Sequence, residues 1–180
     1  MVAVFRPNID DLPAPTIAGN GFRIRWFREG DENAWARVER EAGEFRSESE
    51  AKERFLSDFP DPDMLCDRCM FVENESGETV GTATAMFGQL EGREMGRVGW
   101  VAVIPSHQGR GLGKWLVSLA LQRIAKEHGE MFLTTQTTSI AAVGIYLSYG
   151  FVPYPYGSDD EEAWILLSRA LHRKIPMPGS

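Results

Sequence analysis

An almost unbroken apolar segment, followed by a proline and a glycine-rich loop, constrains the fold of this chain most strongly. Arg97–Ile104 has the composition of a central strand covered on both faces, and Pro105 ends it. After the loop Gln108–Lys114, the pattern predicts a helix that extends to about His128 and is closed by Gly129. Free N–H groups and the dipole at such a helix start form an anion site, so we expect a phosphorylated ligand.

Two other kinds of glycine-rich phosphate loop do not fit this segment. A Walker loop needs a glycine where Gln108 stands, and a serine or threonine where Trp115 follows Lys114. A dinucleotide fingerprint that starts at Gly109 needs its third glycine at the position of Lys114. The spacing therefore argues against nucleotide hydrolysis and against dinucleotide binding.

The rest of the chain predicts a mixed α/β fold. Strands are expected at residues 22–26, 69–72, 79–85 and 131–135, the second and third joined by a turn at 74–77. Helices are expected after an N-cap at Asp31, after the Ser47–Glu50 capping box, and from Ser139 to Tyr149. Phe151–Val152 and Ala163–Ser168 are expected to form a closing pair of strands.

Length and composition favour a single domain. Residues 1–21 contain three prolines and are expected to form an extended N-terminal arm that contributes little packing. The domain is expected to span residues 22–170, with a C-terminal tail at 171–180. The net charge of −7 disfavours nucleic-acid binding, and no segment has the pattern of a signal peptide or a membrane span. We therefore expect a cytoplasmic protein.

The two cysteines, Cys66 and Cys69, form neither a disulfide framework nor a metal site in this interpretation. A structural zinc site normally needs four ligands, and His107, His128 and His172 are far away in the sequence. We expect ordinary buried thiols and no metal. We expect His107, which lies beside the loop, to contact the loop or a phosphate rather than to act as a base.

Two motifs together resemble the GNAT N-acetyltransferase superfamily. Gln108, Gly111 and Gly113 match that family's Gln/Arg-x-x-Gly-x-Gly/Ala loop for acetyl-CoA, and residues 142–151 are similar to its Ala-x-x-x-Tyr-x-x-x-Gly-Phe motif. The element order from Phe22 to Ser168 also matches. The resemblance implies a GNAT-like fold with a central, mostly antiparallel mixed sheet, splayed at its central strand, and with helices on both faces.

The resemblance also implies acetyl-CoA as cosubstrate and direct attack of an acceptor amine on the thioester. Backbone groups of Val101, Ala102 and Val103 would bind the pantetheine arm, and Tyr146 would protonate the leaving thiolate. The alternative for Tyr146 is that its ring only packs. The other residues implied to bind the cosubstrate are Gln108, Gly109, Arg110, Gly111, Leu112, Gly113, Lys114 and Ser139. Ser139 stands where asparagine is common, and its hydroxyl is also a candidate helix cap.

The loop and the helix after it carry only positive charge. Residues 107–126 contain Arg110, Lys114, Arg123 and Lys126 and no carboxylate, although the whole chain is acidic. Arg110 and Lys114 flank the loop and are expected to face the phosphates. Arg123 and Lys126 are explained equally well as a solvated helix face.

The usual place for a general base holds no carboxylate. Many relatives carry one five or six residues before the strand-ending proline, where this chain has Trp100 and Gly99. The base is therefore unassigned, with Glu91 and Glu94 as candidates that would act through water. The same vacancy keeps open an alternative function, a noncatalytic acetyl-CoA-binding or sensing module.

The acceptor is expected to be a small-molecule or peptide amine. Residues 28–75 contain fifteen carboxylates and seven basic residues, a net charge of −8, which favours a cationic acceptor. A solvated acidic surface without a role in specificity explains the same charges. No nucleic-acid or membrane partner is expected, and a homodimer is compatible with the sequence.

Overall fold

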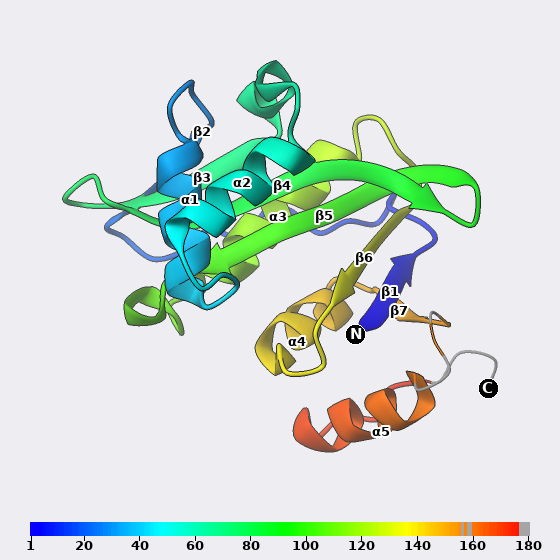
Figure 1. The fold of residues 1–180 in the computed structure, drawn as a ribbon. Coiled ribbons are helices and arrows are strands. Elements are labelled where there is room, and N and C mark those ends of the chain that lie inside the picture. Colours follow the sequence, from blue (N-terminus) through cyan, green and yellow to red (C-terminus); the bar gives the residue numbers. More distant parts are fainter. Residues whose placement is uncertain (156, 158–159, 177–180) are drawn as a thin grey trace. The chain divides into compact units, whose positions relative to one another are not determined.

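The computed structural model describes residues 1–155, 157 and 160–176, and the chain forms two compact units. Unit 1 comprises Met1–Pro13, Phe87–Arg97 and Ile124–Ser180, and unit 2 comprises Ala14–Met86 and Val98–Arg123. In this described part of the chain, hydrogen bonds join seven strands in the order β2-β3-β4-β5-β6-β1-β7 (Figure 1). Two of them, β4 (Thr79–Leu90) and β5 (Arg93–Val103), run through both units. Within the described residues, no helix is both long enough and apolar enough to cross a membrane.

Unit 2 contains the expected hairpin and helix pair. Its further elements are β2 (Phe22–Trp26), α1 (Glu32–Ala42), α2 (Glu48–Asp58), η1 (Pro62–Asp67), β3 (Cys69–Asn74), η2 (Pro105–His107) and α3 (Leu112–Ile124). β3 pairs antiparallel with β2 and with β4. The helices α1 and α2 cover one face of these strands, and α3 lies on the other (Figure 1). The predicted end of α3 at His128 was wrong, because residues 125–127 form turns after Ile124.

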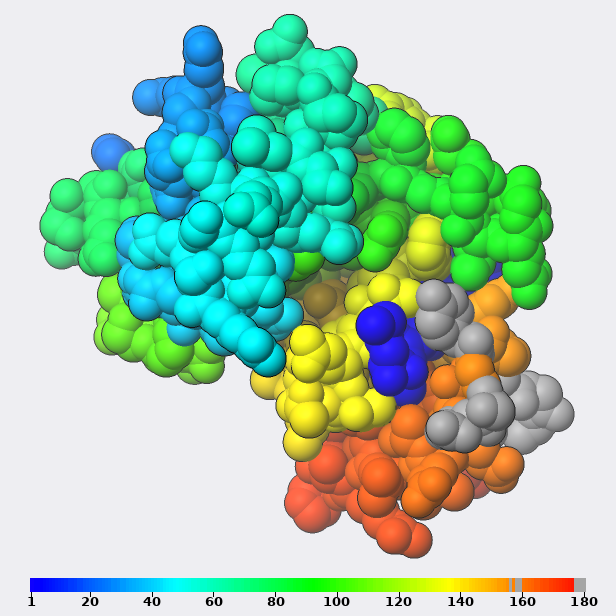
Figure 2. All heavy atoms as spheres, viewed as in Figure 1, coloured from blue at the N-terminus to red at the C-terminus, as the bar shows by residue number. Residues whose placement is uncertain are grey.

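An aromatic cluster fills the space between the helix pair and the strands of unit 2. Trp35 of α1, which is fully buried, contacts Phe55 of α2, Phe59 just after that helix, and Trp100 of β5. Phe27 stacks on Phe55 with ring centroids 5.8 Å apart. Burying these large side chains attaches the helix pair to the sheet. In the space-filling view the two helices cover the strands behind them (Figure 2).

The two helix starts confirm one capping prediction and correct another. Ser47 accepts a hydrogen bond from the Glu50 N–H at 3.1 Å, as the capping box predicts. Asp31 occupies the N-cap position of α1 but makes no side-chain cap bond. Its carboxylate instead binds the Arg25 guanidinium through two hydrogen bonds of 2.5 and 2.9 Å. A bidentate partner therefore replaces the expected cap.

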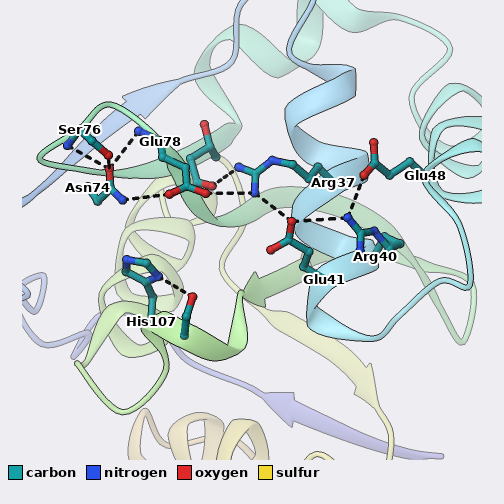
Figure 3. A network of polar contacts seen from close by, with 10 residues as sticks. Arg37, Arg40, Glu41, Glu48, Asn74, Ser76, Glu78 and His107 are labelled. Carbon is teal, nitrogen blue, oxygen red and sulfur yellow. Dashed lines mark hydrogen bonds and ion pairs between the residues drawn. The ribbon is translucent and has the colours of Figure 1, made fainter.

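Charged residues also attach α1 to the β3–β4 turn and to α2 (Figure 3). Arg37 donates to the Thr79 carbonyl and pairs with Glu41 and Glu78. Arg40 reaches Glu48, the first residue of α2, at 2.9 Å. Several carboxylates of the acidic run at residues 28–75 are therefore neutralised by structural ion pairs.

Unit 1 is built around the first strand of the chain. Its further elements are β1 (Val2–Arg6), β6 (Met131–Thr135), α4 (Ile140–Ser148), β7 (Val152–Tyr154) and α5 (Asp160–Ala170). β1 lies between β6 and β7 and is antiparallel to both. β5 pairs in parallel with β6 at Gly96–Met131 and Arg97–Phe132. The expectation of a mixed, mostly antiparallel sheet is confirmed.

Two predictions about unit 1 were wrong. Residues 1–21 were expected to add little packing, yet Val2 and Val4 of β1 are fully buried. Ala163–Ser168, expected as a strand, lies in α5, where Trp164 and Leu167 are buried one helical turn apart. A short apolar run does not by itself distinguish a strand from a helix, and Asp160 with its acidic neighbours favours a helix start.

The limits of the expected domain and tail stay predictions. Leu171 still donates its N–H to the Leu167 carbonyl, so the last turn of α5 passes into the expected tail. Residues 177–180 of that tail lie outside the described residues.

Candidate functional site

The glycine loop has a backbone that favours glycine at two positions. Gly109 and Gly111 have φ angles of +75° and +81°, in the left-handed region that L side chains rarely adopt. The Gly111 carbonyl accepts the first hydrogen bond of α3, from Trp115 at 3.0 Å. The N–H groups that follow Gly111 therefore begin a helix and have no partner within it.

The space beside this loop is open. A Cβ built at Gly109 or Gly111 would meet no described atom within 4 Å. Arg110 and Lys114 are exposed, Gly113 is half-buried, and Leu112 is buried and attaches the loop to the core of unit 2. The backbone donors and two cationic side chains thus lie beside space that a phosphate group can enter.

The backbone of β5 directs its groups to alternate sides just before the loop. The Ile104 N–H donates to the Val80 carbonyl of β4 at 3.0 Å, and the Ala102 carbonyl lies beside Gly81 of the same strand. Because backbone groups alternate along a strand, Val101 and Val103 direct theirs away from β4. Of the three predicted pantetheine contacts, Val101 and Val103 therefore have outward backbone groups, and Ala102 faces β4.

The Gln108 side chain fixes the loop to this strand. Its Nε2 donates a hydrogen bond of 2.9 Å to the Val103 carbonyl. The bond occupies one outward carbonyl of β5 and holds the loop against the end of the strand. His107 beside it places Nδ1 at 3.0 Å from the Ser106 Oγ, as Figure 3 shows.

The positive charges beyond the loop do not act together. Arg123 is buried and binds the Asp67 carboxylate at 2.7 Å and the Asp67 carbonyl at 3.1 Å. Both expectations for Arg123, a contribution to the phosphate field and a solvated helix face, were wrong. Its charge instead attaches α3 to η1. Lys126 is exposed beyond the end of α3.

Tyr146 and Ser139 lie in unit 1. Tyr146 is buried in α4, and its ring packs edge-on against Phe151 with centroids 6.2 Å apart. Ser139 occupies the N-cap position of α4, but its side chain makes no cap bond, so that part of the prediction was wrong. Its carbonyl accepts the Val143 N–H at 3.0 Å.

The position without the expected carboxylate has an unusual backbone. Trp100 has φ +49° in the middle of β5, and a bulky residue rarely adopts this left-handed conformation. Its indole reaches Asp58 at the end of α2, a residue 42 positions away that the sequence reasoning missed. The only sequence signal nearby was the vacancy at Gly99 and Trp100.

The candidate bases Glu91 and Glu94 lie in unit 1. Both are exposed, and Glu91 has φ +50° in the turn between β4 and β5. Glu91 accepts a hydrogen bond from Tyr154, and this bond is the main cause of the raised pKa of that phenol. Glu91 therefore has a structural partner within its own unit.

The cysteines follow the prediction in part. Both are free thiols, and Cys69 is buried, which raises its pKa to about 12, but Cys66 is exposed, contrary to expectation. Within the described part of the chain, no cluster of His, Cys, Asp and Glu residues has the makeup of a metal site.

A cavity of about 420 Å³ in unit 2 lies beside Cys66. Phe55 and Phe59 line this cavity, but no residue of the glycine loop does.

Known proteins resemble this chain in sequence and fold. A model of the Acetyltransferase (GNAT) family matches residues 32–151. The chain is 31% identical over 147 residues to the mycothiol acetyltransferase of Streptomyces griseus subsp. griseus, covering 80% of this chain and 47% of that protein. It is 29% identical over 157 residues to the mycothiol acetyltransferase of Catenulispora acidiphila, covering 81% and 48%. The chain thus spans about half the length of these relatives.

The fold agrees with the sequence match. The crystal structure of a GCN5-related N-acetyltransferase from Sphaerobacter thermophilus superimposes with a TM-score of 0.64 at 22% identity, over 85% of this chain and 48% of that one. That likeness concerns the fold alone. Because the family model matches more than half of the sequence, the chain belongs to the GNAT acetyltransferase family.

Proposed function

We propose that this chain transfers an acetyl group from acetyl-CoA to a primary amine by direct attack of the amine on the thioester. The observation that carries the proposal is the loop at the start of α3, with left-handed Gly109 and Gly111, placed directly after β5. Family membership and the names of the relatives support acetyl transfer without fixing the acceptor.

The residues of the loop fit a cosubstrate that carries phosphates. Its backbone N–H groups would bind the pyrophosphate, and Arg110 and Lys114 would add positive charge beside them. The outward backbone groups of Val101 and the outward N–H of Val103 would bind the pantetheine arm, while Gln108 occupies the Val103 carbonyl and holds the loop to the strand. When bound, acetyl-CoA supplies the thioester carbonyl that the amine attacks.

Tyr146 would supply the proton for the leaving thiolate. A phenol, with an ordinary pKa of about 10, keeps its proton at neutral pH, and the departing thiolate, whose conjugate acid has a pKa of about 8.5 if it resembles cysteine, takes up a proton. The role rests on the family motif, with Tyr146 as its tyrosine. Ser139 would contact the cosubstrate from the start of α4.

A second candidate function is a noncatalytic acetyl-CoA-binding or sensing module. It is favoured by Gly99 and Trp100, which stand where many relatives carry a carboxylate. The sensor and the enzyme share the loop and differ only in whether an amine consumes the thioester.

One experiment separates these functions. The protein is incubated with acetyl-CoA and ethylamine, glycinamide, spermidine or glucosamine, and release of free thiol is followed together with CoA binding by calorimetry. The enzyme predicts thiol release that depends on an amine. CoA binding without such release for any amine favours the sensor, and absence of CoA binding contradicts both.

A further inference from the structure

A carboxylate from α2 is held against the strand position that precedes the proposed thioester site. The Trp100 Nε1–H donates a hydrogen bond of 3.0 Å to Asp58 Oδ2. Trp100 directly precedes Val101, whose backbone faces away from β4. Asp58 is therefore separated from this segment of β5 by one indole side chain.

The indole that holds Asp58 is itself fixed. Its ring meets Trp35 edge-on at 5.2 Å and stacks on Phe45 at 5.6 Å between centroids. The left-handed φ of Trp100 sets the direction in which the side chain leaves the strand. A bulky residue is retained in such a conformation only where its surroundings enforce it. The aromatic cluster provides that constraint.

The second oxygen of Asp58 also has a partner. Arg54 Nε lies 3.0 Å from Oδ1, and the Arg54 guanidinium stands 5.5 Å from the Trp100 ring centroid. A carboxylate has about four acceptor positions, so two remain after the bonds from Trp100 and Arg54. The Asp58 side chain keeps 19% of its surface exposed, so the side chain is in contact with solvent.

Four other carboxylates on or beside the helix pair are engaged elsewhere or buried. Glu41 and Glu48 bind arginines of α1, Asp31 binds Arg25, and Glu39 is buried. Asp58 is the carboxylate of this group that contacts β5 beside Val101.

We propose that Asp58 binds the protonated amine of the acceptor and orients it toward the thioester. This inference rests on the proposed function. A primary amine arrives as an ammonium at neutral pH, and a carboxylate with free acceptor positions is its natural partner. Trp100 and Arg54 are positioning residues, because they act through Asp58. The acceptor class is therefore a primary amine that carries a positive charge.

The bonds and protons of the whole acetyl transfer balance. The ammonium loses one proton to solvent before its nitrogen attacks the acetyl carbon, and a second proton once the nitrogen–carbon bond has formed. The carbon–sulfur bond breaks with its electron pair on sulfur, which gains one proton, so one proton is released in total. Asp58 holds the ammonium before its deprotonation and stays ionised.

The kinetic test compares Asp58→Asn with Glu53→Gln in the amine assay above. Both variants remove one negative charge from α2, but Glu53 is exposed and has no partner among the described residues. We expect Asp58→Asn to raise KM for the amine at least tenfold and to leave KM for acetyl-CoA unchanged. Glu53→Gln should behave as wild type. Trp100→Phe, which keeps a ring and deletes the N–H, should shift the amine KM in the same direction by less.

A second measurement needs neither turnover nor a folded variant at position 58. Ethylamine is titrated into the CoA-bound wild-type protein, and the indole N–H resonance of Trp100, assigned with Trp100→Phe, is followed by NMR. We expect a saturable shift of this resonance. An Asp58→Asn enzyme with unchanged amine KM, or a Trp100 resonance that ethylamine does not move, overturns the inference. Wild-type protein that binds CoA and acetylates no amine contradicts the proposed function instead.

Discussion

A buried glutamate in α1 makes the stability of unit 2 depend on pH. Glu39 lies one helical turn after Trp35, on the face of α1 that packs into the core, and only 1% of its surface is exposed. Its Oε1 has no hydrogen-bond partner among the described residues. Burial, with a smaller contribution from the charge of Glu44, raises the pKa of Glu39 from 4.5 to about 8.

The size of this stability change follows from the difference between the pKa of Glu39 in the folded chain and its pKa in the unfolded chain. Between pH 4.5 and 8 the folded chain keeps a proton that the unfolded chain has released, so stability falls as pH rises. The protonated Glu39 side chain makes its full contribution to the free energy of unfolding below pH 4.5, and this contribution is lost above pH 8. At about 1.4 kcal/mol for each unit of pKa, the loss approaches about 5 kcal/mol.

Glu39→Gln removes this titration and keeps the side-chain size. The free energy of unfolding is measured by urea denaturation from pH 5 to pH 9 for wild type, Glu39→Gln and the exposed control Glu53→Gln. We expect the stability of Glu39→Gln relative to wild type to rise by roughly 3–5 kcal/mol over this range, and that of the control to stay level. Parallel pH profiles for wild type and Glu39→Gln would show that Glu39 ionises in the folded protein as it does in water, and would refute the reasoning.

Two further predictions concern the glycine loop and Tyr146. Gly111→Val places a β-branched side chain at φ +81° and beside the proposed phosphate site, so CoA binding should weaken more than about tenfold in a protein that stays folded. Unchanged affinity by calorimetry would remove the loop from the site. Tyr146→Phe keeps the ring against Phe151 and deletes the hydroxyl, so kcat should fall by roughly 10²–10⁴ with CoA affinity and Tm nearly unchanged. Retention of more than about a third of kcat, under ~0.7 kcal/mol of barrier, argues against the general acid.

The elements that the sequence predicts well are those specified by local chemistry. The Ser47 cap and the Asn74 turn each depend on side chains that bond their own neighbours within four residues. The strand before Pro105 and the helix after the glycine loop were found for the same reason. The site residues of the loop, Gly109 and Gly111, belong to this class.

The elements that were missed depend on distant partners. In the sequence, β1 belongs to a proline-rich segment, and only its pairing with β6 and β7 makes it a buried strand. The apolar run of α5 is short, so its pattern also fits a strand. Arg123 appeared available for a phosphate because Asp67, its partner, is 56 positions away. The contact of Trp100 with Asp58 spans 42 positions and leaves no local pattern. Such contacts cannot be predicted from the spacing of residues that are close together in the sequence.

The central claim, acetyl transfer to an amine, is tested most directly by the product. Wild-type protein and Gly111→Val are incubated with acetyl-CoA and each amine of the panel, and the amines are examined by mass spectrometry. We predict an amine that gains one acetyl group in amounts equal to the free CoA released, and much less of this product from Gly111→Val when acetyl-CoA is kept well below saturation. Release of CoA without an acetylated amine, or equal product with Gly111→Val, would contradict the account.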